Sequence, residues 1–118
     1  MAPEIPKEVG AGWKEALRCY WIKSFGATVL MCRRSLQVSC DREKAVGNDL
    51  FKQIDDLASK QITTDPLRKM AHRIRLLGKI GAHGDYSDID ETIGEKDALD
   101  AITSMRHYLD HVSSYPNS

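Results

Sequence analysis

The sequence has 118 residues, with 17 Lys and Arg, 17 Asp and Glu, and a formal net charge of zero. A chain of this length forms a single domain, in which roughly two thirds of the surface of the unfolded chain can be buried. Because the charges balance, the composition excludes a strong overall attraction to nucleic acid or to an anionic membrane. Any such binding must come from a local patch.

The first twelve residues contain two prolines and two glycines, and they lack the basic and apolar regions of a secretory signal. We expect a flexible leader over residues 1–12, a single helical-bundle domain over residues 13–112 and a polar tail over residues 113–118. The longest apolar run, residues 25–32, is too short to cross a membrane. The three cysteines are odd in number and have no zinc-ligand spacing. These features predict a cytoplasmic protein with reduced thiols, no metal, no cofactor and no membrane contact.

Two helices are expected in the first third of the chain, because apolar residues recur there at spacings of three and four. The first covers residues 13–22 and the second covers residues 25–40, with Lys23 and Ser24 between them. No proline interrupts residues 13–40, so one long helix is the alternative.

Three further helices are predicted from start signals and apolar stripes. Asn48 is a suitable cap for a helix that ends near residue 60, since its side-chain oxygen can accept a free amide of the first turn. Asp65 is expected to cap a fourth helix, which has Pro66 at its first helical position and runs to about residue 82. Thr92 and Glu95 match a capping box at the start of a last helix, which runs to about residue 112.

The predicted fold class follows from these elements. No segment alternates convincingly at period two, so no strand is expected. Four or five amphipathic helices in one domain can bury their apolar stripes only against one another. The sequence therefore predicts an all-α protein, a four- to five-helix up-and-down bundle.

The fourth helix carries the candidate site, because six potentially cationic side chains gather on it. They are Arg68, Lys69, His72, Arg73, Arg75 and Lys79. One interpretation is a solvated outer face, balanced by acidic neighbours in residues 85–91. The other is a strip that contacts phosphates, since clusters of Arg and Lys on one element are typical of backbone binding.

The end of this helix is rich in small residues. They are Gly78, Gly81, Ala82 and Gly84. Glycine costs about 1 kcal/mol relative to alanine inside a helix, so these residues indicate close approach of another backbone or a sharp exit from the helix. In both cases His83 lies at a crowded junction. It serves there either as a structural hydrogen-bonding group or in acid–base or phosphate chemistry.

The stretch from Arg75 to Asp85 resembles the closing motif of an all-α family, the domain of unknown function 4145, in which an arginine precedes a glycine, a pair of small residues and an Ala-His. Residues 27–37, with Arg33 and Arg34, resemble the family's first motif, and residues 92–108 resemble its C-terminal helix. The family is similar to the HEPN superfamily of helical bundles, which are commonly dimeric and include RNases and nucleic-acid-associated modules of bacterial defence systems. The resemblance thus implies a HEPN-like bundle, a homodimer, and an RNA or protein partner.

The sequence departs from the nuclease motif of that superfamily, which is an arginine, four to six residues and a histidine. Seven residues separate Arg75 from His83, and three separate Lys79 from it. Lys79 also stands where the family has an asparagine, and Gln37 where it has a glutamate. We therefore expect a non-catalytic binding or regulatory module, linked to prokaryotic defence. Two alternatives stay open: a metal-independent endoribonuclease that uses His83 with Arg75 or Lys79, and a purely structural protein–protein interaction domain.

The residues with a predicted role fall into two groups. Candidates for contact with nucleic acid or a partner are Arg33, Arg34, Arg68, Arg73, Arg75, Lys79 and His83. The packing motif comprises Gly78, Gly81, Ala82, Gly84 and Asp85. Within the first group, Arg33, Arg34 and His83 are expected to surround one polar junction.

Three other patterns are weaker. His107 and His111 lie one helical turn apart but have no third ligand nearby, so a solvated face is expected rather than a zinc site. Residues 85–90 alternate carboxylates as calcium loops do, but they lack the required glycine and the spaced glutamate. The aromatic residues near the start, Trp13 and Trp21, are expected in the core or at a dimer interface.

Overall fold

The computed structural model describes residues 5–83 and 93–113, and this part of the chain forms five α-helices and no strand. The all-α prediction is therefore confirmed. The helices are α1 (Lys7–Trp21), α2 (Phe25–Arg42), α3 (Leu50–Ser59), α4 (Asp65–His83) and α5 (Glu95–Ser113).

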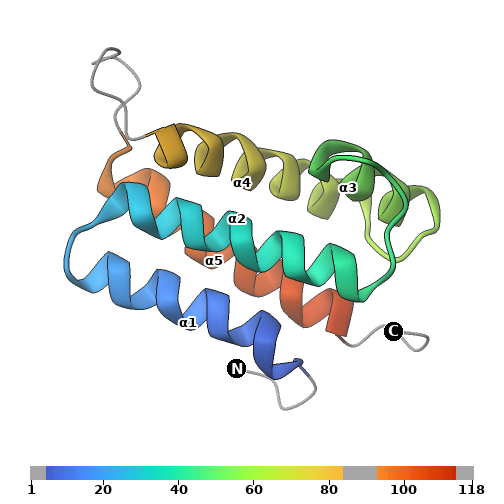
Figure 1. The fold of residues 1–118 in the computed structure, drawn as a ribbon, viewed down its shortest axis with the longest axis horizontal. Helices are drawn as coiled ribbons and strands as arrows, with labels where there is room; N and C mark the ends of the chain where they lie inside the picture. Colours follow the sequence, from blue (N-terminus) through green and yellow to red (C-terminus); the bar gives the residue numbers. More distant parts are fainter. Residues whose placement is uncertain (1–4, 84–92, 114–118) are drawn as a thin grey trace.

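The four long helices run side by side with alternating directions, and the short helix α3 lies against the part of α4 where that helix begins (Figure 1). Helix α2 is central, since it contacts each of the other four helices. Helix α3 packs mainly on α4 and also on α2, near the start of α4, so it does not extend along the far half of the α2–α4 seam. This arrangement decides which side chains of α4 remain accessible.

Apolar stripes of all five helices meet in one core. Its largest fully buried side chains include Leu36 of α2, Ile54 of α3, Ile74 of α4 and Tyr108 of α5. Trp13 joins α1 to α5, because its indole Nε1 donates a hydrogen bond of 2.9 Å to the carbonyl oxygen of Ile102. A buried indole N–H needs such a partner, so this bond fixes how α1 lies on α5.

The first helix begins at Lys7, six positions before the expected start at Trp13. Residues 7–12, which were expected in a leader, therefore belong to α1. The reason is a spacing of four between Val9 and Trp13, which extends the buried stripe backwards. Pro6 precedes the helix, and its carbonyl oxygen accepts the amides of Val9 and Gly10 at 3.1 and 2.9 Å.

Helices α1 and α2 are separate, so the alternative of one long helix over residues 13–40 is wrong. Lys23 has a φ of 62°. The amides of Lys23 and Ser24 bond back to the carbonyls of Tyr20 and Cys19 at 2.9 and 2.8 Å, which is the Schellman pattern of a helix end. The same pattern, with a non-glycine residue at positive φ, ends α2 at Lys44 and α3 at Gln61.

The caps of the later helices lie one residue from their expected positions. Asp49, not Asn48, caps α3, and its carboxylate accepts the amide of Lys52 at 2.8 Å. Thr64, not Asp65, precedes α4, and its hydroxyl accepts the amide of Leu67 at 3.4 Å. A cap stands immediately before the first helical residue, whereas acidic groups within the first turn stabilise the helix dipole instead.

At the start of α5, the carboxylate of Asp97 accepts the amide of Gly94 at 3.2 Å. This is the back-bond that a capping box makes from its third helical position. The expected partner of Glu95 in such a box, Thr92, lies outside the described residues. None of the helices in residues 5–83 and 93–113 is long and apolar enough to span a membrane.

Candidate anion-binding site

Helices α2 and α4 approach each other closely where Gly26 of α2 faces Gly81 of α4. A Cβ atom on Gly81 would overlap the carbonyl oxygen of Gly26 and would lie 2.8 Å from Cγ2 of Val29. Only hydrogen fits at Gly81, because the neighbour is backbone and cannot rotate away. Gly81 thus reflects a close approach of the two backbones.

One helical turn earlier on α4, Arg33 of α2 occupies the space above Gly78. A Cβ atom on Gly78 would overlap Cβ of Arg33 and lie 2.7 Å from its Cδ. The aliphatic part of the Arg33 side chain therefore lies across the backbone of α4, in space that a larger residue at position 78 would fill. The two residues together place a guanidinium in the seam between the helices.

The guanidinium of Arg33 is incompletely satisfied. Its Nε is buried and has no hydrogen-bond partner within residues 5–83 and 93–113. Leaving a buried donor without a partner costs about 1–3 kcal/mol, and more for a charged group. The Arg33 side chain is buried only in part. The guanidinium of Arg33 in the seam can therefore donate hydrogen bonds to an acceptor atom of a ligand or partner molecule.

Two further cations border Gly78 on α4. Arg75 lies one turn before it and Lys79 directly after it, and these two cations, four positions apart, share one side of the helix. Lys79 is exposed and has no ion pair in the part of the chain that the structure describes. The Arg75 guanidinium carbon lies 5.0 Å from the ring centre of Phe51, and its Nε donates to His72 Nδ1 at 3.3 Å. No carboxylate neutralises these groups among the described residues.

The cations in the first half of α4 are instead paired with carboxylates. Arg68 contacts Asp65 at 2.9 Å, and Lys69 contacts the same residue at 3.4 Å. The hydrogen bond from Arg68 lowers the pKa of Asp65 below its ordinary value. Arg73 contacts Asp100 of α5 at 3.7 Å. For this half of the helix, the balanced outer face is the better of the two interpretations.

A second cluster joins α3 to α4 beside the seam. His72 Nε2 lies 2.8 Å from Oδ1 of Asp55, and the ring centres of His72 and Phe51 are 4.7 Å apart. Because Nδ1 accepts a hydrogen bond from Arg75, Nε2 carries the ring proton and donates to Asp55. Both ring nitrogens are thus engaged, so this histidine is not free to serve as an acid or base. Sequence reasoning missed Phe51 and Asp55, since nothing local indicates that α3 packs on this face of α4.

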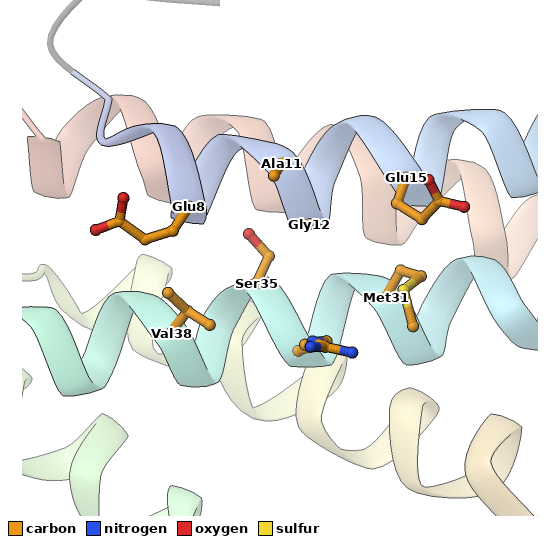
Figure 2. Close-up of a pocket in the computed structure, with 8 residues that line it drawn as sticks. Glu8, Ala11, Gly12, Glu15, Met31, Ser35 and Val38 are labelled. Atoms are coloured by element: carbon orange, nitrogen blue, oxygen red, sulfur yellow. The ribbon is translucent and has the colours of Figure 1, made fainter.

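Arg33 and Arg34 do not share a junction. Arg34 is exposed and lines a groove of about 340 Å³ between α1 and α2, together with Glu8, Glu15 and Met31. Figure 2 shows Ser35 pointing from α2 toward α1 within this groove, with Glu8 and Glu15 on either side. Both glutamates are already paired, Glu8 with Arg42 and Glu15 with Arg18, each at 2.7 Å.

Part of the predicted motif cannot be placed. The side chains of Ala82 and His83 and all of Gly84 and Asp85 lie outside the described residues. The expected junction of His83 with both arginines is therefore wrong as a group of three, and a contact of His83 with Arg33 alone stays a prediction. Gln37, in place of a glutamate, links α2 to α3, because its Nε2 donates to Gln53 Oε1 at 2.6 Å.

The described residues hold no other convincing chemical site. They contain no group of three or more metal-ligand side chains, and the carboxylates of residues 85–90 are not among them. His107 is exposed, as expected of a solvated face. Cys32 and Cys40 are fully buried and free, and burial raises the pKa of each thiol to about 12. Thiols of this kind stay protonated and make poor nucleophiles.

The arrangement around Gly78 can therefore bind an anion. Arg33 provides hydrogen-bond donors, Lys79 and Arg75 of α4 provide further charge, and Phe51, which is 49% exposed, provides an apolar ring beside Arg75. Guanidinium groups match phosphate and carboxylate oxygens well, because their donors are planar and fixed in direction.

Comparison with known proteins gives one family. The model of the family described as "Domain of unknown function (DUF4145)" matches residues 14–118. The match covers most of the chain, and the chain belongs to this family. No curated protein and no solved structure matches it.

Proposed function

We propose that this member of the family is a non-catalytic binding module that holds an anionic partner in the seam between α2 and α4. The observation that carries the proposal is the buried Nε of Arg33, a charged donor without a partner among the described residues. Gly78 makes room for this side chain, at a cost in helix propensity of about 1 kcal/mol. A partner with an oxygen that accepts a hydrogen bond from Arg33 would offset both the unsatisfied donor and the low helix propensity of Gly78.

A single-stranded RNA fits the surroundings best. Exposed aromatic rings stack on bases, and neighbouring cations contact phosphates, which is the common arrangement of single-strand binders. Phe51, whose ring lies beside Arg75, and the exposed Lys79 supply these two kinds of group. Because the first half of α4 is neutralised, only two or three phosphates would be contacted. Binding would therefore weaken with salt at a log–log slope of about −1.4 to −2, given roughly 0.7 per phosphate.

The matched variants Arg33→Met and Arg34→Met test this proposal. They are adjacent, carry the same change, and lie on different faces. Fluorescence anisotropy with a labelled twelve-nucleotide RNA, at several salt concentrations, gives the affinity of each. We expect Arg33→Met to lose most of the binding and Arg34→Met to bind as the wild type does. Equal effects of the two variants, or a wild type without salt-dependent binding, would overturn the proposal.

The endoribonuclease remains the first alternative. Its test is carried out in EDTA, which inactivates contaminating metal-dependent nucleases. Both ring nitrogens of His72 are engaged, so an acid–base role falls to His83. Mixed RNA is incubated with the wild type and with His83→Ala. Cleavage by the wild type that is lost in the variant would establish the enzyme and refute the non-catalytic module.

A second candidate function, protein interaction, is favoured by the turn between α1 and α2. Trp21 and Ile22 are 74% and 77% exposed there, although exposed large apolar side chains more often lie singly. In the homodimer that the likeness to HEPN bundles implies, these two residues would lie at the contact. Light scattering of the wild type beside Trp21→Ala tests the dimer, with Leu99→Ala, a change at a 48% exposed position of α5, as the control. A monomer at high concentration rules it out. The link to prokaryotic defence rests on the same likeness.

A further inference from the structure

Arg75 is held in one orientation by side chains of α3 and α4. Its guanidinium carbon lies 5.0 Å from the ring centre of Phe51, and its Nε donates to His72 Nδ1 at 3.3 Å. The first contact places the guanidinium over the ring, and the second sets the direction of its Nε–H. A long side chain that is otherwise free to rotate is thus held before any ligand binds.

His72, which supports Arg75, is itself fixed. Its Nε2 donates to Asp55 Oδ1 at 2.8 Å, and its ring centre lies 4.7 Å from that of Phe51. Only 14% of the His72 side chain is exposed. Helices α3 and α4 therefore determine together where the guanidinium of Arg75 lies.

This guanidinium keeps most of its capacity for binding. The bond to His72 uses one of its five N–H donors, and no other hydrogen bond or carboxylate engages Arg75 within residues 5–83 and 93–113. Its side chain is buried only in part. The surface around it is apolar, since Phe51 is 49% exposed and Leu76, the next residue on α4, is 50% exposed. A planar cation in apolar surroundings suits the face of an unpaired base, because bases stack on arginine guanidinium planes as they do on aromatic rings.

We propose that Arg75 is the base-binding residue of the RNA site: an unpaired base stacks on its guanidinium, while Arg33 and Lys79 contact phosphates. This assignment rests on the proposed function of the seam and adds a specificity to it. Purine bases have the larger ring systems and stack more strongly, so adenine-rich strands are preferred over uracil-rich ones. Because two residues then contact phosphates, the log–log slope with salt lies near about −1.4, given roughly 0.7 per phosphate.

Arg75→Lys tests the assignment, because lysine keeps the charge and loses the plane. Arg73→Lys is the matched control, since it makes the same change at an exposed arginine that contacts Asp100 instead. Fluorescence anisotropy at low salt compares three labelled twelve-nucleotide probes: oligoadenylate, oligouridylate and an abasic strand with the same number of phosphates. We expect the wild type and Arg73→Lys to bind oligoadenylate about tenfold more tightly than the abasic strand. Arg75→Lys should lose this gain and bind the abasic strand as the wild type does.

The same probes separate the platform from the seam. Arg33→Met should weaken binding of all three probes, because it removes a phosphate contact. An equal loss for all probes in Arg75→Lys would show that Arg75 contacts phosphate, and unchanged binding of all probes would show that it contacts no part of the RNA. Either result overturns the assignment, and the seam stands if Arg33→Met is still impaired.

NMR with two small compounds tests the platform by itself. Adenosine 5′-monophosphate and ribose 5-phosphate share the sugar and the phosphate and differ in the base. A stacked base shifts the Arg75 Nε–H signal through its ring current, so we expect a shift with the first compound and none with the second. The shift should persist in Arg33→Met at a higher concentration of the compound. An Arg75 signal that responds equally to both compounds, or to neither, would refute the proposal.

Discussion

Arg33 of α2 lies across Gly78 of α4, and each residue accounts for the other. The glycine leaves space for the aliphatic part of the arginine, and the arginine fills that space but leaves its Nε without a partner. A protein selected only for stability would place an apolar side chain here, because an apolar group needs no hydrogen bond after burial.

Stability and binding should therefore change in opposite directions in Arg33→Met. Methionine has a similar apolar length and no unsatisfied donor, so we expect the free energy of unfolding to rise by about 1 kcal/mol while RNA binding is lost. Urea denaturation measures the first quantity. Arg34→Met, at an exposed position, should change stability by less than about 0.5 kcal/mol. A marked loss of stability in Arg33→Met would show that the arginine supports the fold and is not kept for a partner.

The glycines at the crossing of α2 and α4 are predicted to respond unequally. A Cβ atom on Gly81 would overlap the Gly26 backbone, so Gly81→Ala should lower the free energy of unfolding by about 1–3 kcal/mol, and Gly81→Leu should unfold the domain. A Cβ atom on Gly26 would lie 3.9 Å from Gly81 Cα, an ordinary contact, so Gly26→Ala should leave stability equal or raised by about 0.5 kcal/mol. Thermal denaturation by circular dichroism compares the variants. Similar melting temperatures for the two alanine variants would contradict this geometry.

Local patterns were sufficient for the all-α fold, because each helix has its own apolar stripe. They also indicated the close approach at Gly81, since glycine within a helix needs a reason. The separation of Arg33 from Arg34 could have been inferred as well. Consecutive helical residues point about 100° apart, so adjacent arginines seldom reach one site.

The contribution of α3 could not be inferred in this way. Phe51 and Asp55 act through His72 and Arg75, which are far from them in sequence. These contacts between the two helices depend on how α3 packs against α4. The residue spacing within either helix does not indicate which faces pack together. The helix ends lie within two residues of those expected, although lysine or glutamine stands where a Schellman end usually has glycine.

Those lysines give a further prediction. Lys44 has a φ of 58°, where a side chain is strained and glycine is not. Lys44→Gly should therefore raise the free energy of unfolding by about 1 kcal/mol. Lys14→Gly, which makes the same change at an exposed position within α1, should lower it by about 1 kcal/mol. Chemical denaturation decides the matter, and two variants of the same sign would be incompatible with the positive φ at Lys44.

The buried thiols predict a loss of stability at alkaline pH. Burial raises the pKa of Cys32 and of Cys40 from 9.0 to about 12, so the folded protein keeps both protons while the unfolded chain releases them above pH 9. The stabilisation is complete below pH 9 and is lost as the pH rises toward 12. Within that window each thiol should reduce the free energy of unfolding by about 1.4 kcal/mol per pH unit.

Cys32→Ala and Cys40→Ala separate this effect from other alkaline titrations. Each variant should lose stability at every pH, because a small cavity replaces the sulfur. Above pH 9 the free energy of unfolding of each variant should nevertheless fall less steeply than that of the wild type. The slopes should differ by the contribution of the one missing thiol, about 1.4 kcal/mol per pH unit. Urea denaturation at half-unit steps from pH 8 to pH 11 gives the slopes. Parallel curves for the wild type and both variants would mean that the thiols ionise equally in the folded and unfolded states, which contradicts their burial.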